Sequence, residues 1–372
     1  MKRQTIVLLM SLFVLYSCST NTEKEIAYQI EKDTLVDVPK YVYSGLYEDD
    51  TALFFYCKPY ECDSLLLYKK GATNWDFFDF LKIPEVFANS KNLDKAITKW
   101  VLVNQDTIIA YEFRKQITFL DVKNNDVITT FALENEEKKY SLEHRCFQQF
   151  QWNKTNQSLP FMYFSWGNSN RKYNGDVEII AEYSLNKGLT VFPLKYPYEV
   201  YDTYIAKYPY CEPIVVYHGD TIVVAFNHSP MVLCYDVKTQ KVDSMYIKNK
   251  HFKKLPQLDT TGLSEISVPN FIEMTYLLNF YFEYLLYDFH KEIYYRFFAQ
   301  DMPLKDENGL LNTINDKVFG ATLIDKNFNI IGDVLFKPTE YRLNYYPTSE
   351  GLLAIDRDKD KVIISKLTFD YE

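Results

Sequence analysis

The chain has 372 residues, of which 50 are acidic and 41 are basic, so its formal net charge is −9. This balance argues against a nucleic-acid partner and against a protein that lies flat on an anionic lipid surface, because both need a basic face. Tyrosine (32 residues) and phenylalanine (27 residues) are abundant. Aromatic side chains in such numbers are typical of sheet proteins that bury them between layers.

The N-terminus predicts a lipoprotein signal. Lys2 and Arg3 precede an apolar stretch over residues 6–16, and Leu-Tyr-Ser-Cys at 15–18 has the form of a lipobox. We expect residues 1–17 to be removed, which takes the net charge to −11, and Cys18 to carry the lipid anchor. The alternative is an ordinary signal peptide with a chance cysteine. Residues 18–40 would hold the acylated cysteine and a flexible tether, and residues 41–372 a single domain.

Short strand-like runs, separated by turn residues, follow the tether in sets of four. The first set is 41–47, 52–56, 64–68 and 75–81, and a segment with some helical character at 84–99 leads to the second, 100–103, 107–111, 116–121 and 126–131. The third is 146–152, 161–164, 177–185 and 189–194; the fourth is 214–217, 221–226 and a hairpin over 232–246. The fifth is less regular, at 274–279, 284–288 and 292–298, and hairpins over 321–336 and 352–369 end the chain.

These sets of four predict an all-β fold, a β-propeller of four-stranded blades. A spacing of roughly 52 residues between the middle repeats favours six blades, whereas counting hairpins gives seven. With six blades, an N-terminal strand could close the last one. Two β-sandwiches in tandem are the alternative, because short strands at regular spacing suit them too. The recurrence of one hairpin phrase and the lack of a linker favour the propeller.

The hairpin phrases are Leu-Cys-Tyr-Asp-Val-Lys-Thr at 233–239 and Gly-Leu-Leu-Ala-Ile-Asp-Arg-Asp at 351–358. Together with the lipobox they resemble a group of Bacteroidetes cell-envelope lipoproteins. The domain of those proteins has no known function and looks like a TolB-like β-propeller. The resemblance covers the mature chain and rests on the pattern of recurring hairpin phrases. It therefore implies the fold and an envelope location and assigns no site residue. Ser19 provides no evident inner-membrane retention signal, which favours the outer membrane.

Five cysteines follow Cys18. Cys57 and Cys62 flank Lys-Pro-Tyr-Glu, a spacing that a hairpin disulfide could use, and both the disulfide and two free thiols remain open. Cys234 lies within a predicted strand and is expected to be a small core residue. The odd count leaves at least one cysteine free or paired with another chain. Cys146 and Cys211 complete the set.

No motif predicts a metal, a cofactor or a catalytic centre. Asp356, Asp358 and Asp360 begin like a calcium loop, but Lys361 and Leu367 stand where such a loop needs glycine and glutamate. The sequence contains no Gly-x-Ser-x-Gly elbow, no HExxH motif and no glycine-rich phosphate loop. The histidines are scattered along the chain, at His144, His218, His228, His251 and His290.

One aromatic cluster is too irregular for a strand. Proline interrupts the stretch 196–210, which places Tyr198, Tyr201, Tyr204 and Tyr208 on a predicted loop between two sheets. Loop tyrosines offer flat apolar faces with a hydroxyl, which suit sugars or protein partners. The alternative is that they pack onto the blades. The polar stretch 168–175 is a second possible rim loop.

Two functions from different classes stay open. The first is a non-catalytic binding or sensing module for a protein or glycan, supported by the predicted lipid anchor and the tyrosine-rich loop. The second is a hydrolase or lyase that acts on a polysaccharide or another envelope polymer. An enzyme would need several carboxylates and a histidine that face one another, because catalytic groups can assemble from distant positions.

Overall fold

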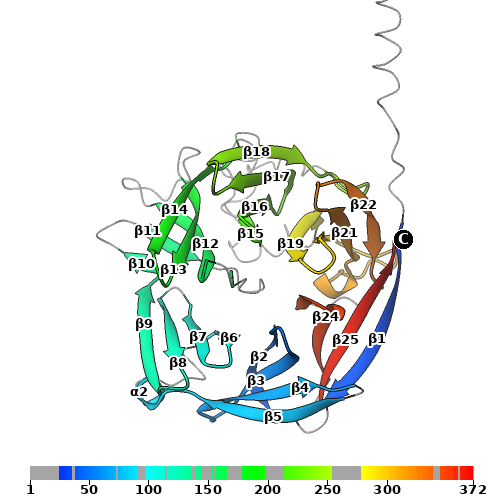
Figure 1. The fold of residues 1–372 in the computed structure, drawn as a ribbon. Coiled ribbons are helices and arrows are strands. Elements are labelled where there is room, and N and C mark those ends of the chain that lie inside the picture. Colours follow the sequence, from blue (N-terminus) through cyan, green and yellow to red (C-terminus); the bar gives the residue numbers. More distant parts are fainter. Residues whose placement is uncertain are drawn as a thin grey trace, which may run out of the picture.

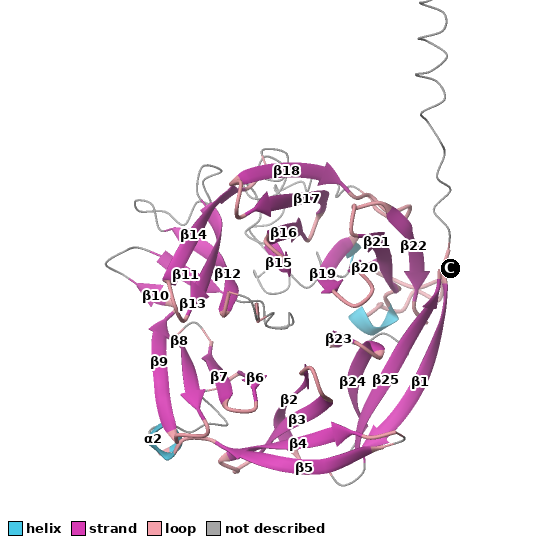
Figure 2. Ribbon diagram, viewed as in Figure 1, coloured by secondary structure: helices cyan, strands magenta, loops and turns pink. Residues whose placement is uncertain are grey.

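A computed structural model describes residues 25–35, 38–72, 74–89, 97–113, 115–135, 140–143, 152–153, 156–165, 178–197, 213–253, 278–337, 344–358 and 361–371. Strands in these residues form six antiparallel sheets arranged as the blades of a ring (Figure 1). Figure 2 shows that helices contribute little to this ring. The predicted all-β propeller with six blades is therefore confirmed.

The first three blades follow one another in the chain. Blade 1 contains β2 (Tyr41–Glu48), β3 (Leu53–Pro59), β4 (Ser64–Lys70) and β5 (Trp75–Lys82). The short helix α2 (Glu85–Ala88) leads to blade 2, which contains β6 (Lys99–Asn104), β7 (Thr107–Glu112), β8 (Gln116–Asp121) and β9 (Asp126–Ala132). Blade 3 has five strands, β10 (Glu134–Asn135), β11 (Tyr140–Glu143), β12 (Ser158–Ser165), β13 (Glu178–Ser184) and β14 (Gly188–Lys195).

The other three blades complete the ring. Blade 4 contains β15 (Pro213–His218), β16 (Thr221–Phe226), β17 (Ser229–Asp236) and β18 (Lys241–Tyr246). Blade 5 contains β19 (Tyr281–Asp288), β20 (Ile293–Ala299), β21 (Phe319–Asp325) and β22 (Ile330–Leu335), with the short 3-10 helix η3 (Ile314–Asp316) before β21. Blade 6 contains β23 (Tyr345–Thr348), β24 (Gly351–Asp358), β25 (Lys361–Asp370) and β1 (Ala27–Leu35).

The N-terminal strand closes the last blade, as the six-blade interpretation anticipated. β1 pairs antiparallel with β25 from Ala27 opposite Asp370 to Leu35 opposite Val362. Residues 27–35 lie within the range 18–40 that the sequence suggested as tether, so part of that range belongs to the sheet. Because blade 6 combines both ends of the chain, the ring is closed by hydrogen bonds between its first and last strands.

Two predicted sets of strands differ from the structure. The first strand of blade 3 is β11, upstream of the predicted strand at 146–152, most of which lies outside the described residues. Most of the predicted run 274–279 also lies outside the described residues, and the first described strand of blade 5 is β19, which begins at Tyr281. The hairpin over 321–336 supplies the outer half of blade 5 and not a further blade. A 19-residue connection between β20 and β21, residues 300–318, hid this relation in the sequence.

Aromatic and aliphatic side chains fill the interfaces between blades. Separate clusters of buried residues lie between blades 1 and 2, 2 and 3, 3 and 4, and 6 and 1, and the largest cluster joins blades 4, 5 and 6. Between blades 5 and 6, the ring of Tyr345 stacks on that of Phe297 at 4.6 Å between centroids. Most of the abundant tyrosine and phenylalanine in the described residues therefore serves blade packing.

A buried arginine joins blades 4 and 5. Arg296 of β20 donates hydrogen bonds to the backbone carbonyls of Phe226, Ser229, Pro230 and Ile247, at 2.7–3.2 Å. Its guanidinium carbon lies 3.5 Å from the centroid of the Phe282 ring. Burial lowers the pKa of Arg296 to about 9. Carbonyl dipoles and an aromatic face thus take the place of a carboxylate partner.

Cys57 and Cys62 do not form the disulfide that their spacing allowed; both are free thiols. Cys57 lies on β3 with its side chain in the core between blades 6 and 1, whereas Cys62 lies in the turn that follows that strand. Burial raises the pKa of the Cys57 thiol to about 12. Cys234 packs at the edge of the core of blades 4 to 6, as predicted. In the described part of the chain no helix is long and apolar enough to cross a membrane.

Candidate functional site

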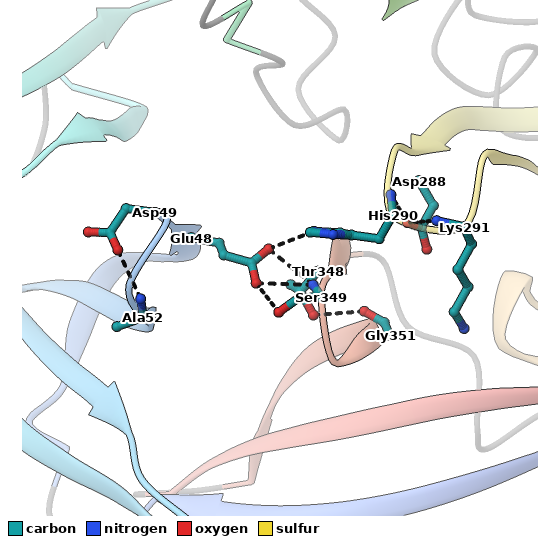
Figure 3. Close-up of polar contacts among 9 residues, drawn as sticks. All are labelled: Glu48, Asp49, Ala52, Asp288, His290, Lys291, Thr348, Ser349 and Gly351. Atoms are coloured by element: carbon teal, nitrogen blue, oxygen red, sulfur yellow. Dashed lines mark hydrogen bonds and ion pairs between the residues drawn. The ribbon is translucent and has the colours of Figure 1, made fainter.

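The turns that join the two innermost strands of each blade lie at one end of the ring, because turns in an antiparallel meander alternate between its two ends. We call this the axial end, because its turns follow the strands that lie nearest the axis of the ring. These innermost strands include β2, β6, β15, β19 and β23 (Figures 1 and 2). Three of these turns bring Glu48, His290 and Ser349 together (Figure 3). These three residues, from blades 1, 5 and 6, form the axial cluster.

Glu48 is the centre of the axial cluster. Its carboxylate accepts hydrogen bonds from the backbone N–H of Ser349, at 3.0 and 3.1 Å, and from the Ser349 hydroxyl. Nε2 of His290 lies 3.1 Å from Oε2 of Glu48. Because the partners are 242 and 301 residues away in the chain, only closure of the ring brings these groups together.

Buried polar groups fix the turns that carry these residues. The carboxylate of Asp288, at the end of β19, accepts the backbone N–H groups of His290 at 3.0 Å and Lys291 at 3.1 Å, and Tyr295 donates to it at 3.4 Å. In blade 6, Thr348 donates to the carbonyl of Gly351 at 2.8 Å. Short turns with these internal bonds hold the axial cluster in a defined geometry.

A second carboxylate extends the polar surface to blade 2. Asp49 accepts hydrogen bonds from the backbone of Thr51 and Ala52 and from the side chain of Gln105, at 2.8–3.3 Å. Its partial burial would raise its pKa, but the hydrogen bonds from Thr51, Ala52 and Gln105 outweigh that effect and lower the pKa. Asp49 is therefore an ionised acceptor bound to its own turn, next to the Glu48 carboxylate in the chain.

An exposed aromatic ring borders the axial cluster. Phe289 is 61% exposed, and its ring centroid lies 4.0 Å from that of His290. The exposed ring offers an apolar face that a bound ligand could cover. A flat apolar face beside a carboxylate, an imidazole and a hydroxyl is the combination that carbohydrate sites use, with stacking on the ring and hydrogen bonds at the rim.

The connectivity of the axial cluster differs from that of a nucleophilic triad. In a triad the histidine lies between the nucleophile and the carboxylate, so that it can take the proton of the nucleophile. Here the carboxylate of Glu48 lies between Ser349 and His290, and no hydrogen bond in the described residues joins those two. The Ser349 hydroxyl therefore donates to the Glu48 carboxylate and not to the imidazole of His290.

The other described histidines take part in packing. His218, at the end of β15, lies between two tyrosine hydroxyls, 2.7 Å from Tyr294 and 2.9 Å from Tyr287. Burial lowers its pKa. His228 follows β16 and lies at the end of that strand away from His218. Its Nδ1 lies 3.4 Å from the carbonyl of Phe280. His218 and His228 thus lie at opposite ends of β16.

The sequence-predicted binding residues cannot be placed. Tyr198, Tyr201, Tyr204 and Tyr208, the stretch 168–175 and Cys18 all lie outside the described residues. The axial cluster was missed, although Glu48 follows the first predicted strand of the first set, 41–47, and His290 lies in the turn between the predicted runs 284–288 and 292–298. Which strands are innermost, and which blades adjoin across the closure, is not visible in the sequence. Among the described histidines, cysteines and acids, no group of three is arranged to hold a metal ion.

Comparison with known proteins gives relatives by structure alone. No protein-family model matches the sequence, and none of the curated proteins does. A member of the DUF4221 family from Bacteroides vulgatus superposes with a TM-score of 0.68 at 12% identity, over 95% of this chain and all of that one. The fold is that of this DUF4221 protein. A predicted exported protein from Bacteroides fragilis follows, with a TM-score of 0.54 at 10% identity, over 95% of this chain and 97% of that one.

Proposed function

We propose that the protein is a non-catalytic binding module of the cell envelope that holds a glycan at the axial end of the ring. The observation that carries this proposal is the exposed ring of Phe289 beside the axial cluster. Sugar rings stack on such faces through their C–H groups, while Glu48, His290 and Ser349 offer acceptors and donors for hydroxyls. The turn bonds of Asp288 and Thr348 preorganise these groups, which lowers the entropy cost of binding.

The envelope location rests on the predicted signal and on a structural relative. The lipobox ending at Cys18 supports export and acylation, with the outer membrane favoured. The Bacteroides fragilis protein with this fold is a predicted exported protein, which supports a location outside the cytoplasm.

A hydrolase is the second candidate, because a carboxylate and a histidine do meet at the axial end. Two observations argue against a hydrolase. Glu48 lies between Ser349 and His290, and the carboxylates of Asp288 and Asp49 accept hydrogen bonds from the backbone of their own turns. An enzyme of this kind would release product from the glycan that it binds, and the binding experiment below detects this by chromatography of the incubated ligand.

The test is binding of the purified chain to a panel of envelope and dietary polysaccharides, followed by titration calorimetry with the best ligand. Phe289→Ala should weaken binding about tenfold or more, because stacking on an aromatic face is lost. Phe80→Ala is the matched control, since Phe80 is 57% exposed but lies on the outer strand β5. Glu48→Gln should also weaken binding.

Equal affinity of the parent chain and Phe289→Ala would refute the axial site. If Tyr198, Tyr201 and Tyr204 changed together to alanine abolished capture instead, the tyrosine-rich loop would be the contact surface. Capture of a protein without any affinity for glycans would replace the glycan with a protein partner.

A further inference from the structure

The connection between β20 and β21 exposes four large aliphatic side chains. We call residues 301–317 the excursion. Leu310 and Leu311 are 68% and 66% exposed, and Leu304 and Ile314 are 39% and 44% exposed. Scattered single aliphatic residues are ordinary on a protein surface, but four on one connection form a patch of the kind that marks an interaction surface.

Internal hydrogen bonds hold the excursion in shape. Lys305 and Leu311 form an isolated antiparallel bridge, and the N–H of Asp306 donates to the carbonyl of Leu310 at 2.9 Å. The Asp306 carboxylate accepts the N–H groups of Asn308 at 2.9 Å and Leu310 at 2.8 Å. The leucines are thus presented on a small hairpin that these hydrogen bonds preorganise.

The excursion lies close to the point where the described chain begins. Glu25 forms a bridge with Asp333 of β22 and lies 3.9 Å from Lys250. Three residues further on, Lys253 pairs with Asp301, the first residue of the excursion, at 2.8 Å. The segment 247–253, which follows β18, therefore contacts both Glu25 and the first residue of the excursion.

The predicted acylated cysteine limits the distance between this surface and the membrane. Seven residues, 18–24, separate Glu25 from the end of the signal peptide, and at roughly 3.3–3.6 Å per residue they span at most about 25 Å. An anchor at Cys18 therefore keeps the bilayer near Glu25. The surface around Glu25, with Lys250, Lys253 and the end of the excursion at Asp301, is the part of the ring that the tether brings toward lipid.

We propose that the excursion is a second membrane contact, in which Leu304, Leu310 and Leu311 enter the interface of the bilayer that anchors Cys18. The inference rests on the proposed envelope anchoring. The excursion itself holds four acids, at 301, 306, 307 and 316, and two lysines, at 305 and 317. It has no excess of positive charge, so insertion depends on apolar burial and not on anionic lipid. Binding should accordingly change little with salt concentration.

This contact would orient the ring. β20 runs from the turn that carries His290 to Ala299, so the excursion that follows it lies at the end opposite the axial cluster. With the excursion in lipid, the axial end faces away from the membrane and stays open to a large glycan. The lipid anchor alone would leave the ring free to rotate on its tether.

The test places a tryptophan probe on the excursion. The acylated Leu311→Trp chain is reconstituted into phosphatidylethanolamine and phosphatidylglycerol vesicles, with or without lipids brominated along the acyl chain. We expect brominated lipid to quench the added tryptophan by at least about half, judged against the parent chain. Ile128→Trp is the matched control, because Ile128 is a similarly exposed aliphatic residue on β9 of blade 2. Its tryptophan should not be quenched.

Cys18→Ser separates the two proposals. If this variant still floats with vesicles as the parent does, the proposal that Cys18 anchors the chain is refuted. Quenching of the tryptophan in Leu311→Trp, mixed directly with vesicles, then decides whether the excursion binds lipid. Anchoring without quenching of Leu311→Trp would overturn the membrane contact. A dimer in solution that Leu310→Ser with Leu311→Ser dissociates would also overturn it, and would assign the patch to a second copy of the chain.

Discussion

Lys317 is a buried lysine whose environment favours the uncharged form of its amine. Its side chain is buried between η3 and β21, donates to the carbonyl of Asn279 at 2.7 Å and lies 4.7 Å from the centroid of the Tyr281 ring. Burial lowers its pKa from 10.5 to about 7, although the charges of Asp301 and Glu283 oppose that shift. The unfolded chain therefore binds one more proton than the folded chain between these two pH values.

This difference predicts a pH dependence of stability. Lys317 destabilises the fold most below pH 7, and the penalty falls as the pH rises from about 7 toward 10.5. The free energy of unfolding of the parent should rise relative to that of Lys317→Met, with a slope of up to about 1.4 kcal/mol per pH unit. Urea unfolding at several pH values between 7 and 10 measures it.

Lys253→Met is the control for this experiment, because Lys253 is a largely exposed lysine paired with Asp301. Its unfolding free energy should run parallel to that of the parent across the same range. If the Lys317→Met curve were also parallel to the parent, Lys317 would titrate at its ordinary pKa, and its burial would have no consequence for stability.

At the scale of a single strand, tight packing of β21 leaves no room for a side chain at Gly320. A Cβ on Gly320 would overlap the ring of Phe298 and lie 2.5 Å from the backbone carbonyl oxygen of Val334. Neither neighbour can yield easily, since Phe298 is buried among Phe280 and Phe282 and Val334 is on the next strand. The close approach of β20, β21 and β22 thus depends on the missing side chain.

Gly320→Ala should lower the free energy of unfolding by about 1–3 kcal/mol through overpacking. Chemical denaturation monitored by tryptophan fluorescence gives the value. Gly71→Ala is the comparison, because its Cβ would meet its nearest neighbours at 3.3 Å in an exposed turn. Equal losses in the two variants would show that the cost comes from glycine replacement in general and not from contact with Phe298.

At the scale of the whole molecule, closure by β1 holds the ring together. Nine residue pairs join β1 to β25, and Ile26 is buried against blade 5. Removal of residues 25–35 would leave β25 as an open edge beside the hydrophobic core. We expect a loss of at least about 3 kcal/mol of unfolding free energy, from the lost pairing and apolar burial, and self-association through the exposed edge.

Size-exclusion chromatography with light scattering and thermal unfolding measure these effects. A chain that lacks only residues 19–24 is the control, because it keeps β1 and its partners. A shortened chain that stayed monomeric and as stable as this control would mean that the ring does not need the strand contributed by the N-terminus.

The sequence by itself determined the local elements of this protein. Alternation of apolar and polar residues and polar turns predicted most strands of blades 1, 2 and 4 closely, because hairpins between sequence neighbours depend on local pattern. It also determined the repeat and thus the propeller, and the missed pairing in blade 5 has a local cause, the inserted excursion between β20 and β21.

Only the tertiary structure decided what lies together across the ring. Glu48, His290 and Ser349 are ordinary turn residues in the sequence, and they meet because closure by β1 places blades 5, 6 and 1 side by side. The same holds for Arg296, whose charge is stabilised by carbonyls of blade 4. Periodicity reports which side chains are buried, but contacts between residues hundreds of positions apart depend on blade order and ring closure.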